Sequence, residues 1–233
     1  MILPRATLYT LGRLFIAYII SLIVALIFGI YCVFEKDVAK IWLPIIDVLQ
    51  TVPLLAFFSI AIEIIIGVLG GKNIAYEIAS IFLTFTAMFW NLFYAVYDSI
   101  NSTPQQLQSF THVFRIPFLY ALKYVYIPLS IPNLVSNSII SWANGWFFVV
   151  LNEYVFYEAK MPPNKGIGNF LHYCYVEGNI QNMIIVILWV CVIIIITHLF
   201  IWDKLLLMSG KFKISAISEN PIVKSPSTKR SVS

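Results

Sequence analysis

The chain has 233 residues, of which 60% are hydrophobic and only 11% are charged. A soluble domain carries about 25% charged residues, so this composition excludes an ordinary soluble surface and favours an integral membrane protein. The net charge is +4, with much of the basic excess near the C-terminus instead of on one folded face, which argues against nucleic acid as a partner.

Five apolar stretches are candidate membrane spans, because a spanning helix needs about 20 apolar residues. We therefore expect an all-α, polytopic membrane helix bundle. The candidate spans lie at about 11–34, 54–69, 74–97, 134–151 and 183–202. A cleaved signal peptide is a weak alternative for the first stretch, because its apolar run is too long and no small-residue cleavage site follows.

The stretch 54–69 carries Glu63 in its middle. An ionisable residue inside a span is costly unless it is paired or hydrated, which makes Glu63 a candidate for a translocation path. The alternative is that the span is short and Glu63 reaches water at its outer end. The preceding segment contains Pro44 and Pro53, which predicts a bent lead-in at the membrane interface.

The loop 98–130 begins with a helix signal. Asn, Ser and Thr at 101–103 are N-cap types, and Pro104 suits a first helical turn. Leu107, Phe110 and Phe114 then recur at spacings of three and four, which predicts an amphipathic helix. We expect four prolines to fix this loop, with the last two interrupting the chain before the fourth span: Pro104, Pro117, Pro128 and Pro132.

Two interpretations of this helix stay open on the pattern alone. It lies on the bilayer with its apolar face down, or it inserts into a groove on a partner protein. Interfacial helices usually carry many basic residues, whereas this helix carries only Arg115.

Polar residues form a stripe along the fourth span. They follow at steps of four, four, three and eight, which places them on nearly one face: Asn133, Asn137, Ser141, Asn144 and Asn152. Inside the hydrocarbon region such a stripe must face protein or water. It is therefore either a set of hydrogen bonds between helices or the wall of a path for a polar solute.

Basic residues indicate the orientation. With five spans, ten of the 15 Lys and Arg residues fall on the side of the 98–130 loop and the C-terminus. The positive-inside rule places that side in the cytoplasm and the N-terminus outside. We expect residues 211–233 to form a disordered cytoplasmic tail, because they contain few large apolar side chains.

Several motifs together resemble the inner-membrane permease subunits of ABC importers, in particular the nitrate/sulfonate/taurine type. The loop of that family typically reads P-x-E-L-x-E-A-A, followed by a Gly, an L-P and a second P. Pro104, Leu107, Pro128 and Pro132 fall on matching positions, whereas Ser109-Phe110-Thr111 replaces E-A-A and Arg115 replaces the Gly. The segment around Pro53, Asn152-Glu153 and the GIGNFL run at 166–171 resemble further family motifs, so the likeness covers roughly 8–210.

The resemblance implies a coupling helix, with Leu107, Phe110 and Phe114 buried in an ABC ATP-binding subunit and Arg115 paired with a partner carboxylate. It also implies a second permease copy or paralogue, and a solute-binding protein outside that meets a short helix at 166–172. ATP and Mg would belong to the partner, so we expect no cofactor in this chain. A small nitrate-, sulfonate- or taurine-like anion is the expected solute, although relatives carry other solutes and no Lys or Arg lies clearly within a span.

Three rival functions fit the sequence less well. A secondary carrier is usually larger and built from repeats, and none is visible here. An intramembrane enzyme needs a nucleophile with a base or a metal triad, and the scattered cysteines and histidines offer neither. A structural subunit without a path fits the asparagine stripe less well. We therefore expect a transport subunit that is not an enzyme.

Overall fold

The computed structural model describes residues 2–52, 54–70, 73–158 and 165–212. Every regular element in these ranges is a helix, which confirms the all-α class. In chain order the elements are α1 (Ile2–Phe34), α2 (Lys36–Thr51), α3 (Leu54–Leu69), α4 (Asn73–Asn101), α5 (Gln105–Val113), α6 (Phe118–Ala121), η1 (Leu122–Tyr126), α7 (Ile127–Glu158), α8 (Ile167–Val176), α9 (Ile180–Thr197), η3 (His198–Trp202), α10 (Asp203–Ser209) and η4 (Gly210–Phe212).

Four helical stretches of the described chain are long and apolar enough to cross a membrane: Leu3–Phe34, Ile74–Asn101, Phe118–Val155 and Ile180–Phe212. They contain four of the predicted spans and extend beyond each of them, so the chain is a polytopic helix bundle. The remaining predicted span, 54–69, coincides with α3, which has 16 residues. Its crossing stays a prediction, because a full span needs about 20 residues.

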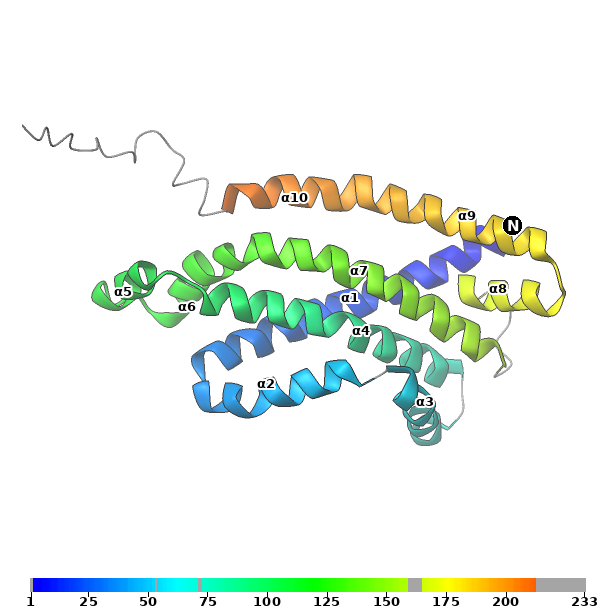
Figure 1. Cartoon of the computed structure of the whole chain (residues 1–233), viewed down its shortest axis with the longest axis horizontal. Coiled ribbons are helices and arrows are strands. Elements are labelled where there is room, and N and C mark those ends of the chain that lie inside the picture. The colour runs from blue at the N-terminus through cyan, green and yellow to red at the C-terminus, as the bar shows by residue number, and fades with distance from the viewer. Residues whose placement is uncertain (1, 53, 71–72, 159–164, 213–233) are drawn as a thin grey trace, which may run out of the picture.

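The core forms where α4 lies between α1 and α7 and packs against both (Figure 1). Leu14, Met88 and Trp146 belong to one buried cluster that joins these three helices. The C-terminal helical stretch joins the same cluster through Trp202, whose ring lies 5.9 Å from Tyr18 and 5.8 Å from Trp142. Most side chains of α9 stay exposed, as expected of a helix that faces lipid.

The segment before α3 does not bend at Pro44 as predicted, and Pro53, the other proline of that prediction, lies outside the described residues. Residues 36–51 form the regular helix α2, with Pro44 inside it, and α2 runs back alongside α1 (Figure 1). Proline removes one backbone hydrogen bond from a helix interior. Burial of Ala39 and Ile46 against a cluster that includes Leu92 and Phe93 offsets that loss.

Pro128 and Pro132 do not interrupt the chain as predicted, because helical structure continues from Phe118 to Glu158. Pro128 follows η1, a π-helical turn in which the Ile127 N–H donates to the Leu122 carbonyl, whereas Pro132 lies inside α7. A wider turn directly before Pro128 makes room for a ring that an α-helical turn would exclude.

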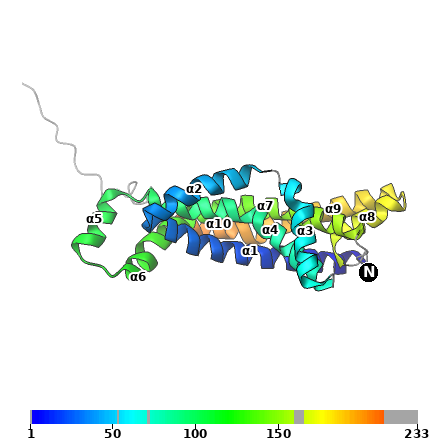
Figure 2. The same cartoon turned by 90° about the horizontal axis from the view of Figure 1, so that it is seen from below.

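The two ends of the bundle are different. The N-terminus lies beside α8 at one end, whereas α5, α6 and η4 lie at the opposite end (Figures 1 and 2). We call these the α8 end and the α5 end. Of the predicted tail, residues 211–212 belong to η4, and residues 213–233 lie outside the described chain.

Candidate functional site

The predicted loop helix is present as α5 at the α5 end. It begins directly after Pro104, whose carbonyl accepts a hydrogen bond from the Leu107 N–H at 3.0 Å. Two views show α5 and α6 standing beyond the ends of the long helices (Figures 1 and 2). This placement puts α5 outside the long helices, and both interpretations, a helix lying on the bilayer surface and a docking helix, stay predictions.

Arg115 makes the turn that ends α5. Its φ is 47°, in the left-handed region that glycine favours. The Ile116 N–H donates to the Thr111 carbonyl at 3.0 Å, which is the six-to-one bond of a Schellman motif. The chain therefore keeps the left-handed turn at the position where the importer pattern has glycine, with an arginine under strain.

The predicted docking side chains do not all face the same way. Leu107 lines a hollow of about 300 Å³ together with Pro128 and Phe212, so it faces other parts of its own chain. Phe114 is 65% exposed, and Arg115 is also exposed. The side chain of Phe110 lies outside what the structure describes.

Most of the polar stripe on α7 bonds to α4. Asn133 donates to the Ser99 hydroxyl at 2.9 Å, and the buried Ser141 donates to the Met88 carbonyl at 3.2 Å. The buried Asn152 donates to the Ser80 carbonyl at 3.2 Å. Asn137 donates to Asn133 on its own helix at 2.8 Å. These contacts support the interpretation of interhelical hydrogen bonds at both ends of the stripe.

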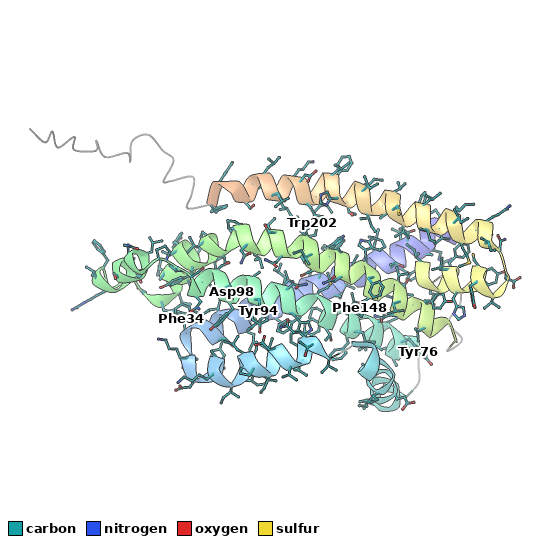
Figure 3. All side chains as sticks on the ribbon, in the orientation of Figure 1. Phe34, Tyr76, Tyr94, Asp98, Phe148 and Trp202 are labelled. Atoms are coloured by element: carbon teal, nitrogen blue, oxygen red, sulfur yellow. The ribbon has the colours of Figure 1, made fainter. Side chains whose placement is uncertain are left out.

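Asn144 differs from the rest of the stripe. It is exposed, and it lines a hollow of about 310 Å³ between α2, α4 and α7 together with Gln50, Trp90 and Asn91. Phe148 also lines the hollow, and Figure 3 shows it on α7, further from the α5 end than Tyr94 and Asp98 of α4. Uncharged amide side chains therefore lie together on a half-open surface, where they can contact a polar solute.

Glu63 does not join this hollow. Its side chain is exposed on α3, a helix that packs against α4. Because an exposed side chain of a membrane bundle faces lipid, a partner or water, both interpretations of Glu63 stay predictions.

A buried charge cluster lies at the α8 end. Arg13 of α1 donates two hydrogen bonds to Glu77 of α4 and one to Glu153 of α7, each at 2.6 Å. Arg13 is 5% exposed and Glu153 is 1% exposed, whereas Glu77 is 32% exposed and reaches solvent. Because Arg13 lies between two carboxylates, neither buried charge is left uncompensated.

The same cluster binds the beginning of α8. Glu153 accepts a hydrogen bond from the Gly168 N–H at 3.0 Å, and Thr10 accepts one from the Ile167 N–H at 2.9 Å. The Thr10 hydroxyl in turn donates to Glu153 at 2.8 Å. A Cβ atom at Gly166 would collide with the Glu153 carboxyl group, and one at Gly168 with the Val150 carbonyl. Glycine at both positions is thus required for this approach.

Residues 17–207 match the model of the family described as the binding-protein-dependent transport system inner membrane component. The chain belongs to this family. The match confirms the prediction that the chain is a permease-type membrane component, that is, a transport subunit and not an enzyme.

Two nitrate import permease proteins NrtB are similar to this family member. The protein of Synechococcus elongatus is 23% identical over 171 residues, which cover 73% of this chain and 56% of the relative. The protein of Leptolyngbya laminosa is 24% identical over 182 residues, which cover 78% of this chain and 60% of the relative. The chain thus spans less than two thirds of the length of either relative.

The sequence patterns of this family member do not predict the charge cluster around Arg13 and Glu153. In the sequence, Glu153 and the run 166–171 stand out only through their resemblance to family motifs, and no local pattern pairs Glu153 with Arg13. The two glycines of GIG, separated by one residue, were the available signal of a close backbone approach. Nothing in a single sequence names the carboxylate that approaches them.

Proposed function

We propose that the chain is the membrane-spanning permease subunit of an ATP-driven ABC importer, and that it forms part of the translocation path for a small solute. Its proposed partners are a second permease copy or paralogue, an ABC ATP-binding subunit, an extracytoplasmic solute-binding protein and the lipid bilayer. ATP and Mg are bound by the ATP-binding subunit. A small anion of the nitrate, sulfonate or taurine kind is the first solute to test, because both relatives are described as nitrate import permeases.

The position of α5 and the way it ends are the observations that support this proposal most directly. This helix stands beyond the long helices and ends in the left-handed turn at Arg115 (Figure 1). The hydrogen bond from the Ile116 N–H to the Thr111 carbonyl closes this turn and sets the direction in which the chain leaves α5. The prolines at 104 and 117 border the helix on either side, and a continuous helical stretch from Phe118 leads into α7. Motion of α5 would therefore be transmitted to the helix that carries Asn144.

The docking surface we propose is the C-terminal part of α5. Val113 is 75% exposed and Phe114 is 65% exposed, and large apolar side chains in such a position are typical of a protein contact. Leu107, nearer the start of α5, instead lines a hollow together with residues of its own chain. Arg115 adds a positive charge beside the apolar surface, where a partner carboxylate can pair with it.

The path we propose runs along the surface of α2, α4 and α7 that carries the Asn144 hollow. The hollow is open on one side, so a second permease copy supplies the opposite wall. Amide groups on this surface hydrogen-bond a passing solute without holding it as strongly as a charge would. The α5 end is the cytoplasmic side, which puts the N-terminus outside and residues 213–233 in the cytoplasm.

Pull-down of the ATP-binding subunit with tagged permease tests the proposal. Phe114→Asp places a charge in the docking surface and is expected to release the ATP-binding subunit while the permease stays in the membrane. Val176→Asp is the matched control, because Val176 is 64% exposed and lies on α8 at the opposite end. Retention of the ATP-binding subunit by Phe114→Asp would remove α5 as its docking helix.

A further inference from the structure

The charge cluster at the α8 end has no part in the docking or path just proposed. It joins four elements: α1 through Thr10 and Arg13, α4 through Glu77, α7 through Glu153, and α8 through two backbone N–H groups. Such a cluster constrains where each element lies, because none can move without separating a hydrogen-bonded pair.

Glu153 is the centre of the cluster. Its carboxylate accepts hydrogen bonds from Arg13, Thr10 and the Gly168 N–H, which satisfies a side chain that is only 1% exposed. The first N–H groups of a helix have no partner within the helix, and the positive end of its dipole favours an anion there. Glu153 and Thr10 therefore supply acceptors for the first turn of α8.

Further contacts hold α8 against α7 beyond its first turn. The His172 ring stacks on Tyr154 with centroids 4.5 Å apart, and its Nδ1 lies 2.9 Å from the Tyr154 carbonyl oxygen. Cys174, two residues further along α8, is 1% exposed. The helix is thus attached at its N-terminus and again one turn later.

We propose that Glu153 is a positioning residue that fixes α8 to the bundle, so that α1, α4, α7 and α8 keep their mutual placement throughout the transport cycle. This inference rests on the proposed function. Opening at the α8 end then occurs between this body and the second permease copy, on the surface of the Asn144 hollow. It does not occur by α8 swinging away, because that motion would strip a buried carboxylate of its donors.

Native Cys174 reports on the placement of α8. Burial also raises the pKa of its thiol, so it reacts slowly with N-ethylmaleimide while α8 is docked. In a Cys32→Ala, Cys191→Ala background, the labelling rate is measured on the whole complex in nanodiscs, without nucleotide and with ATP plus vanadate. We expect equal, slow rates. If the labelling rates of the two states differ by more than about threefold, α8 moves between them, and the proposal is overturned.

The hydrogen bonds themselves are tested on the permease without nucleotide. Thr10→Val removes the acceptor of the Ile167 N–H and is expected to speed Cys174 labelling about tenfold, whereas Thr10→Ser keeps a hydroxyl and restores the slow rate. Thr7→Val is the matched control, because the Thr7 hydroxyl accepts from Trp189 of α9 at 2.9 Å and donates to the Leu3 carbonyl of α1 at 2.9 Å. Equal rates for Thr10→Val and Thr7→Val would refute the role of the cluster. This second experiment needs no ATP-binding subunit, so it tests the role of the cluster even if the proposed function is wrong.

Discussion

Removing the Arg13 side chain should destabilise the whole bundle. Arg13→Met keeps an unbranched apolar chain but leaves Glu153, 1% exposed, without its cation. Breaking a buried ion pair by removing one partner costs about 3–5 kcal/mol, because a charge is left in a low-dielectric site. In a chain of this size each kcal/mol lowers Tm by roughly 2–4 °C, so the expected loss is roughly 6–20 °C.

Thermal unfolding of the purified permease in detergent measures this loss. Lys40→Met is the matched control, because Lys40 and its partner Asp37 are 75% and 93% exposed and such pairs contribute little. The double variant Arg13→Met, Glu153→Gln should recover most of the stability, since only the partly exposed Glu77 then lacks a cation. A Tm for Arg13→Met equal to that of Lys40→Met, or no recovery in the double variant, would refute the electrostatic argument.

Two further predictions concern the stripe and the turn. Asn144→Leu should stop uptake while the ATP-binding subunit stays bound. Asn152→Leu should instead lower the free energy of unfolding by about 1–3 kcal/mol, because it removes buried hydrogen bonds to α4. If uptake and unfolding assays gave the reverse pattern, the roles of the two asparagines would be exchanged. Arg115→Gly should stabilise the end of α5 by about 1 kcal/mol or less, since relief of left-handed strain outweighs the flexibility of glycine. Limited proteolysis at the α5–α6 loop should then slow by up to about fivefold, and faster cleavage would contradict the strained turn.

Local sequence signals predicted the long helices and the start of α5 well. Apolar runs of about span length can satisfy their backbone groups in lipid only as helices, so their composition was decisive. The start of α5 after Pro104 followed from capping types and from the lack of a proline N–H. The helix breaks predicted at prolines 44, 128 and 132 do not occur, because α2 is buried against the bundle and a π-turn makes room for the ring of Pro128.

The polar stripe on α7 was predicted from helical spacing, but spacing does not predict what each of its residues contacts. Helical spacing placed Asn133, Ser141, Asn144 and Asn152 on one face, which is a property of one helix. Which of them meets α4 and which meets open space depends on how α4 and α2 cross α7. Only the packed bundle assigns Ser141 to a carbonyl of α4 and Asn144 to a hollow.

Composition and short-range spacing predict a membrane bundle of helices with a short amphipathic helix between two spans, because those properties depend on neighbours within a few residues. The tertiary structure alone decided the pairing of Arg13 with Glu77 and Glu153, which lie 64 and 140 residues away along the chain. A buried charge is stable only where its partners converge in space, and that convergence is set by helix packing and not by any spacing in the sequence.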